Sequence, residues 1–238
     1  MSLFSGFYAI VATIDKNFTY AAMAILIAAV FDSLDGRVAR ATGSTSKFGV
    51  EYDSLSDVIA FGVAPGLLAY MWALKGYGRF GWLAAFLYVA CGALRLARFN
   101  VQVDTAQKKH FLGLPIPAAA ATIATSVLFY YQLGYQGEFK MVIMPILIYF
   151  LAFLMVSNIR YYSFKEMGFL RRKPFRSSVM GIILLVIVCI EPEIMLFVIF
   201  ASYLLSGLVY TLVTRKKALV DEIPPGFRES QSEKDGLQ

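Results

Sequence analysis

Eight residues in one short window have the types and the spacing to do chemistry. They follow the pattern D-x2-D-G-x2-A-R-x8-G-x3-D-x3-D and are Asp32, Asp35, Gly36, Ala39, Arg40, Gly49, Asp53 and Asp57. The four carboxylates lie near the ends of two strongly apolar segments, where an unpaired charge is costly and usually has a function. This window is therefore the first candidate for a functional site.

The spacing of the four aspartates predicts two pairs on helix faces. Asp32 and Asp35 form an i, i+3 pair and Asp53 and Asp57 form an i, i+4 pair, so a hairpin through residues 41–49 can point both pairs into one pocket. Two carboxylates about 5 Å apart repel each other by roughly 3 kcal/mol at an effective dielectric of about 20. A divalent cation would remove this repulsion. An all-oxygen ligand set favours Mg²⁺ or Mn²⁺, and two ions could share the four aspartates.

The remaining residues of the window suit a phosphate-bearing ligand. Gly36 and Gly49 would let a bulky ligand approach both helices closely, and Arg40 offers a forked donor for phosphate. Alternatively, the acids are ordinary interfacial residues with arginine partners and the glycines only permit helix packing. That reading explains any single position. It fails for the set, because eight specified identities recur by chance at a given start with a frequency of about 10⁻¹⁰.

The composition of the whole chain is that of an integral membrane protein. Of 238 residues, 58% are apolar and only 16% are charged, which exceeds the apolar content of soluble domains. Apolar runs recur near the length of about 20 residues that crosses a bilayer, without the alternation of barrel strands. We therefore predict an all-α, polytopic membrane bundle of about eight transmembrane helices, with spans at Leu3 to Ile14, Phe18 to Arg40, Tyr52 to Leu74, Phe80 to Leu96, Leu114 to Tyr131, Met141 to Ser157, Val179 to Ile190 and Ile194 to Val213.

Three features qualify these spans. The first run has only 12 residues, which indicates a shallow hairpin or an N-terminus shorter than the natural helix, and no basic residue precedes it as in a signal peptide. Pro192 marks the turn that separates the last two spans. Residues 215–238 are polar, with Pro224 and Pro225 among them, and resemble a disordered cytoplasmic tail.

The basic residues predict the orientation of the bundle. Of the 22 lysines and arginines, 18 fall in segments on one side, and the exceptions are Lys16, Lys75, Arg79 and Lys140. Because positive residues are retained on the cytoplasmic side of short loops, the carboxylate window and both termini should face the cytoplasm. The net charge of +6 then reflects juxtamembrane clusters that suit anionic lipid, and we expect no nucleic-acid partner.

Cysteine and histidine offer little for catalysis. Cys91 and Cys189 lie inside apolar spans and are interpreted as small hydrophobic residues. His110 is the only histidine, which leaves too few imidazoles for a histidine-based metal site and argues against a histidine-centred triad. The aspartates therefore remain the principal candidates for chemistry.

At its eight window residues the chain resembles the CDP-alcohol phosphotransferase family, whose signature it matches at every position. The resemblance implies a six-helix membrane core at residues 1–157, usually a homodimer, that exchanges the CMP moiety of a CDP-linked lipid for an alcohol. Residues 158–214 would then form two additional transmembrane helices. It also implies that Asp32, Asp35, Asp53 and Asp57 are metal ligands, that Asp57 is the general base, and that the CDP-lipid site is lined by Gly36, Ala39, Arg40 and Gly49.

Two further stretches bear on the acceptor alcohol. Residues 95–100 (R-L-A-R-F-N) and 113–120 (G-L-P-I-P-A-A-A) resemble those of bacterial phosphatidylserine synthases, which join CDP-diacylglycerol to L-serine at the bacterial inner membrane. Arg95 or Arg98 could then bind the serine carboxylate, and Asn100 belongs to the same stretch. Equally, the arginines could only obey the positive-inside rule and Pro115 and Pro117 could only start a helix.

Two rival functions remain open at this point. The chain could be a member of the same family that uses another alcohol, such as glycerol 3-phosphate or inositol phosphate, both of which also need basic residues. A cation transporter could use the acids to bind its substrate, but transporters commonly show repeated halves. Since the acids form one cluster without an internal counterpart, we rank transport far below catalysis.

Overall fold

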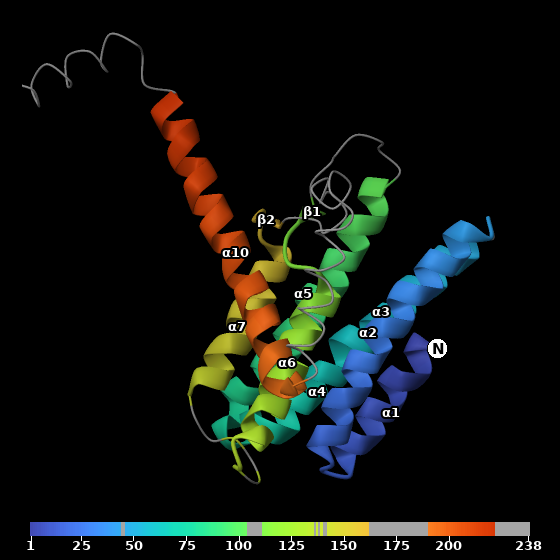
Figure 1. Ribbon diagram of the computed structural model, residues 1–238, viewed down its shortest axis with the longest axis vertical. Helices are drawn as coiled ribbons and strands as arrows, with labels where there is room; N and C mark the ends of the chain where they lie inside the picture. Colours follow the sequence, from blue (N-terminus) through green and yellow to red (C-terminus); the bar gives the residue numbers. More distant parts are fainter. Residues whose placement is uncertain are drawn as a thin grey trace, which may run out of the picture.

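The computed structural model describes residues 1–43, 46–103, 111–135, 137, 139, 142–161 and 190–221, and this part of the chain is almost entirely helical (Figure 1). In chain order the elements are α1 (Ser2–Ile14), α2 (Phe18–Ala41), α3 (Lys47–Asp57), the π-helix η1 (Val58–Val63), α4 (Ala64–Ala69), the π-helix η2 (Tyr70–Leu74), the 3₁₀ turn η3 (Lys75–Tyr77), α5 (Gly78–Val103), β1 (Phe111–Leu112), α6 (Ile116–Gln132), α7 (Ile143–Val156), β2 (Arg160–Tyr161) and α10 (Pro192–Asp221).

The predicted helical segments are largely confirmed. Seven of the eight coincide with helices, and the seventh, Val179 to Ile190, lies outside the described residues except for Ile190. Within the described part, Phe18–Ala39 and Phe48–Val101 are long and apolar enough to cross a membrane, whereas α1, α7 and the first half of α10 are shorter apolar helices. The arrangement supports a membrane bundle without fixing eight spans.

The helices extend further into polar sequence than the apolar runs indicate. Helix α3 begins at Lys47, because the Ser46 hydroxyl caps it by accepting a hydrogen bond from the Gly49 backbone N–H at 3.0 Å. Helix α10 continues to Asp221 through good helix formers such as Lys216 and Leu219. The first residues of the predicted tail, 215–221, are thus helical, and residues 222–238 lie outside the described part.

A short β-ladder departs from the all-α prediction. Strand β1 pairs antiparallel with β2, with Phe111 opposite Tyr161. Gly113 follows β1 with a φ of +83°, and a Cβ there would collide with the Met155 carbonyl, so only glycine lets the chain pass this close to α7. The ladder holds the start of α6 against the end of α7.

Small residues bring the first helices close together. Helix α1 packs along α2 and against η1, with buried alanines at 9, 12, 21, 22 and 28 filling the interface. A Cβ on Gly6 would lie 2.6 Å from the Ala60 Cα, so α1 touches the backbone of η1 directly. This packing fixes the position of α2 relative to the α3–η1 segment.

The segment from α3 to η3 is helical throughout, but two π-helical stretches, η1 and η2, interrupt its α-helical winding. Pro65 has no N–H to donate to the Phe61 carbonyl four residues earlier. The fully buried Tyr88 of α5 donates its hydroxyl to that carbonyl at 3.0 Å instead. The π-turns of η1 follow Asp57 immediately, and such turns are frequent at functional sites.

The ends of the helices separate into two groups. Figure 1 shows the C-terminal ends of α2, α5 and α10 at one end of the molecule, whereas the α1–α2 and α6–α7 turns lie at the opposite end. Lys16, one of the four basic residues outside the predicted cytoplasmic segments, lies in the α1–α2 turn. The fold therefore has the up-and-down topology that the charge pattern requires.

Candidate functional site

Three of the four predicted aspartates meet at the junction of α2 and α3. One carboxylate oxygen each from Asp32, Asp53 and Asp57 lies within 4.8 Å of the others. Asp32 comes from the second half of α2, and Asp53 and Asp57 lie one turn apart on α3. The hairpin predicted between the two helices does bring residues from both into one cluster, which we call the aspartate cluster.

The aspartate cluster has the features of a cation site. The Asp57 Oδ1 atom is buried and has no hydrogen-bond partner among the described residues. A buried oxygen left without a partner is costly, and three clustered carboxylates repel one another. Oxygen-only ligands match the preference of Mg²⁺ and Mn²⁺, so the residues present fit a hard divalent ion.

Asp35 is placed differently from the other three aspartates. It accepts a charged contact from the Met1 backbone amine at 3.4 Å, and its side chain is exposed. It is nonetheless close enough to interact electrostatically with Asp32 and Asp53. Asp35 therefore lies at the edge of the aspartate cluster, where it also lines a cavity.

A cavity of about 340 Å³ opens beside the aspartate cluster. Its wall includes Asp35, Gly36 and Ala39 from α2, and Gly49 and Asp53 from α3. Three of the residues predicted to line a CDP site, Gly36, Ala39 and Gly49, thus face one space. The side chain of the fourth, Arg40, lies outside the described part. The volume falls within the range of about 300–1,000 Å³ typical of ligand pockets.

Other residues of this cavity wall were not predicted. They are Met1, Ser2, Leu3, Ser46, Val50, Tyr52 and Ser56. Ser46 had a detectable signal, because a serine three residues before Gly49 at the start of an apolar run is a typical helix cap. The N-terminal residues had none, since their place depends on how α1 packs against η1.

The three tentative acceptor residues occupy the C-terminal part of α5 but face different partners. Arg95 is largely buried and interacts electrostatically with Asp57. The Asn100 amide donates to the Ser54 hydroxyl at 2.9 Å and so reaches α3 between Asp53 and Asp57. Arg98 donates to the Asn158 side chain at 2.8 Å, after the end of α7. Arg95 and Asn100 therefore adjoin the acids, whereas Arg98 is engaged elsewhere.

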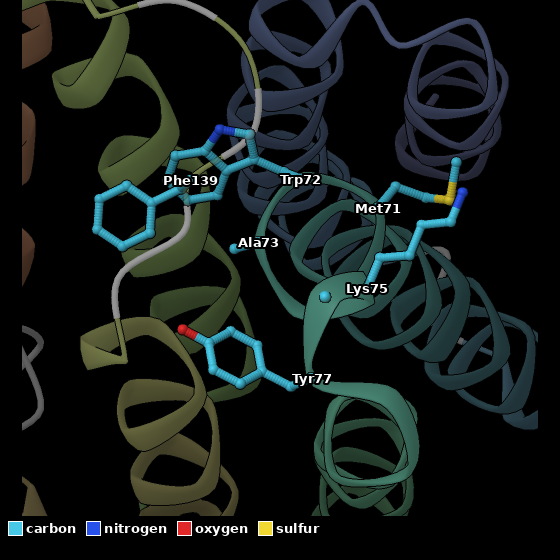
Figure 2. Close-up of a pocket in the computed structure, with 7 residues that line it drawn as sticks. Met71, Trp72, Ala73, Lys75, Tyr77 and Phe139 are labelled. Carbon is cyan, nitrogen blue, oxygen red and sulfur yellow. The ribbon is translucent and has the colours of Figure 1, made fainter.

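A second cavity lies away from the acids. It has a volume of about 250 Å³ and is lined by Met71, Trp72, Ala73, Lys75, Gly76, Tyr77 and Phe139 (Figure 2). Its described lining contains no carboxylate. Of these two cavities, the one beside the aspartate cluster is the one whose lining includes predicted site residues.

Comparison with known proteins agrees with this site. The CDP-alcohol phosphatidyltransferase family matches residues 1–156, which include the aspartate cluster and its cavity. A CDP-diacylglycerol-serine O-phosphatidyltransferase of Helicobacter pylori is 37% identical over 222 residues, covering 93% of this chain and 92% of that protein. One of Mycobacterium leprae is 32% identical over 212 residues (86% and 69%), and an archaetidylserine synthase of Methanothermobacter thermautotrophicus is 43% identical over 166 residues (69% and 67%). Because the family match covers residues 1–156 and these relatives align over most of the chain, the chain belongs to the CDP-alcohol phosphatidyltransferase family.

Proposed function

We propose that the protein is a phosphatidylserine synthase, which transfers the phosphatidyl group of CDP-diacylglycerol to the hydroxyl of L-serine and releases CMP. The observation that carries this proposal is the aspartate cluster opening onto a cavity lined by Gly36, Ala39 and Gly49. The relatives that cover most of the chain are named for the same donor and acceptor. A transporter needs no such cavity for a lipid-linked nucleotide.

The divalent metal would be Mg²⁺ or Mn²⁺, two ions in our proposal, held by Asp32, Asp53 and Asp57 with Asp35 at the border. When bound, the metal would neutralise charge on the diphosphate and on the leaving CMP. The unpartnered, buried Asp57 Oδ1 supports this assignment. Arg40 of the same signature is the proposed phosphate-binding arginine.

Asp57 is the proposed general base. The serine hydroxyl would give its proton to the Asp57 carboxylate as its oxygen bonds to the phosphorus that carries diacylglycerol. The bond from that phosphorus to the CMP oxygen breaks, and CMP leaves with the electron pair. Phosphoryl-type transfer depends mostly on positioning and charge neutralisation, which clustered acids and a fitted cavity provide.

The acceptor subsite is proposed to lie between the aspartate cluster and α5. The Arg95 Nε atom is buried and has no acceptor within the described part of the chain, so the carboxylate of serine would satisfy it with a charge-assisted hydrogen bond. Asn100, held by Ser54, would help to shape this subsite. Arg98 would act indirectly, by holding the chain after α7 through Asn158.

The cellular setting follows from the proposed substrates. We propose eight transmembrane spans in the bacterial inner membrane, with a homodimeric assembly and the active site facing the cytoplasm. The acyl chains of the donor could then stay in lipid while its nucleotide reaches the cavity from water. The two long apolar stretches and the uneven distribution of basic residues support this orientation.

The test uses purified protein in detergent with CDP-diacylglycerol and Mg²⁺ or Mn²⁺. We expect CMP release with L-serine and little with glycerol 3-phosphate or inositol phosphate, and we expect chelation by EDTA to stop it. Release with another acceptor but not with serine would refute the assignment of serine. A protein without CMP release under any of these conditions would overturn the proposed reaction.

A further inference from the structure

Helix α3 carries two of the three acids of the aspartate cluster, yet it buries little apolar surface of its own. Its large apolar side chains lie outside the bundle, with exposed fractions from 51% to 79%: Phe48, Val50, Tyr52 and Leu55. Helices in proteins are held mostly by the packing of an apolar face. Apart from its continuation into η1, α3 therefore depends on polar contacts to fix its rotation about its own axis.

Ser54 makes a polar contact of this kind with α5. The Asn100 amide donates to the Ser54 hydroxyl oxygen at 2.9 Å, and that hydroxyl is 3.1 Å from the Val50 carbonyl of its own helix and 3.4 Å from the Asn100 Oδ1 atom. A serine hydroxyl has one hydrogen and two lone pairs, so it can accept from Asn100 and donate to Val50 at the same time. Both side chains are partly buried. A short chain of hydrogen bonds thus joins α5 to the backbone of α3.

Helix α5 holds the same segment at a second point. The fully buried Tyr88 donates its hydroxyl to the Phe61 carbonyl of η1 at 3.0 Å. Asp57 lies between Ser54 and Phe61 in the sequence, so the two contacts with α5 are on either side of it. Helix α5 is therefore the support against which the rotation of the α3–η1 segment is fixed.

The place of Ser54 on α3 lets it hold the helix without occupying the acidic face. Successive residues of an α-helix are about 100° apart, so Asp53 and Asp57 differ by about 40° around the axis and Ser54 lies about 60° beyond Asp57. At about 5 Å from the axis, a rotation of about 20° would move a side-chain oxygen by nearly 2 Å. Metal-ligand distances tolerate only about 0.2 Å. A small rotation of α3 would therefore spoil a metal site shared with Asp32.

We propose that Ser54 is a positioning residue for the metal ligands: through it, Asn100 of α5 keeps Asp53 and Asp57 at the distance from Asp32 that a divalent ion requires. This inference rests on the proposed function and deepens it. Neither Ser54 nor Asn100 is itself a ligand, since both act through the backbone of α3. Asn100 then serves the metal site as well as the acceptor subsite.

The experiment measures Mn²⁺ binding to the purified protein without substrate, from the electron paramagnetic resonance signal of the free ion. We expect Ser54→Ala to raise the Kd for Mn²⁺ about tenfold, as for loss of a group that orients a metal ligand. Ser54→Thr keeps the hydroxyl and should restore the wild-type Kd. Ser33→Ala is the matched control and should leave the Kd unchanged. Ser33 also follows an acid of the aspartate cluster and donates to a carbonyl four residues earlier, at 2.9 Å, but it is exposed on α2.

A double-mutant cycle tests whether Ser54 and Asn100 act as a pair. We expect Asn100→Ala to raise the Kd for Mn²⁺ by a similar factor, and the double variant to bind no more weakly than either single variant. Independent effects would overturn the proposal, as would a lower thermal midpoint in detergent with an unchanged Kd. An Asn100→Ala variant that raises only the KM for L-serine would overturn it too. A wild-type protein that binds Mn²⁺ but releases no CMP would instead refute the proposed function.

Discussion

Asp57 combines two properties that distinguish it from the other aspartates of the site. It belongs to the aspartate cluster, and it alone among these carboxylates has a buried oxygen that lacks a partner in the described structure. A neutral amide at this position keeps the shape of the side chain but cannot accept the proton of serine. The role of Asp57 can therefore be separated from that of its neighbours by a single substitution.

We predict that Asp57→Asn lowers kcat by about 10²- to 10⁴-fold, the usual contribution of a general base. Binding of CDP-diacylglycerol should be largely retained, because Gly36, Ala39 and Gly49 still line the cavity. CMP release and equilibrium binding of the labelled donor measure the two quantities. Asp15→Asn, in the turn after α1, is the control. Full turnover by Asp57→Asn would contradict the assignment.

Asp35→Asn should have a different signature, because Asp35 borders the cavity instead of lying within the aspartate cluster. We expect a higher metal concentration for half-maximal activity and a higher KM for CDP-diacylglycerol, each by about tenfold, as expected for loss of one charged contact. Titration of Mg²⁺ at several donor concentrations measures both. Unchanged values would exclude Asp35 from metal and donor binding.

At the residue scale, the sequence predicted which groups belong together better than how each is used. The i, i+4 spacing of Asp53 and Asp57 is preserved on α3, so their proximity followed directly from helical geometry. The different environments of Arg95 and Arg98 could not be predicted. They depend on which side of α5 faces α3 and which faces the chain after α7.

At the scale of elements, the hydrogen bond that Tyr88 donates to the Phe61 carbonyl joins α5 to the π-helical segment η1. Tyr88→Phe removes the donor to the Phe61 carbonyl, which Pro65 has no N–H to replace. We predict a loss of about 1–2 kcal/mol in the free energy of unfolding. A lower thermal midpoint in detergent would report it. Tyr8→Phe on α1, where the side chain is exposed, should leave the midpoint unchanged, and an equal fall in both variants would contradict the prediction.

The helices themselves were predictable because long apolar runs leave few alternatives for the backbone. Their winding was not: η1 comes just before Pro65, and its Phe61 carbonyl accepts a hydrogen bond from Tyr88 of α5, a contact that no apolar pattern indicates. The β1–β2 ladder was also missed, since two-residue strands carry no periodicity and their pairing joins segments far apart in the chain.

For the molecule as a whole, the two groups of helix ends make the orientation testable. In a background without Cys91 and Cys189, we predict that a membrane-impermeant maleimide labels Gly76→Cys in intact cells. Thr42→Cys, in the exposed turn after α2, should be labelled only in inverted membrane vesicles. The reason is the excess of basic residues at the end of the bundle that carries Thr42. The reverse pattern would place the active site outside the cell.

Charge counting predicts a sidedness that the labelling experiment tests, whereas it says nothing about where α10 packs. The position of α10 depends on the stacking of Phe197 on Phe129 and on the bond from Gln132 to Glu191, which join α10 to α6. Neither contact leaves a local signal in the sequence. Long-range packing of this kind decides where a helix outside the signature lies.

The wide turns directly after Asp57 also set the angular phase of α3. An ordinary helix advances about 100° per residue, so a chain with one residue fewer between Val58 and Val63 would swing Asp53 and Asp57 away from Asp32 while leaving α4 in register with the bundle. The distance from Asp53 and Asp57 to Asp32 therefore depends on how many residues η1 contains, although η1 itself contains no acidic residue. Single-residue insertions or deletions at this point should be far more damaging than most substitutions there.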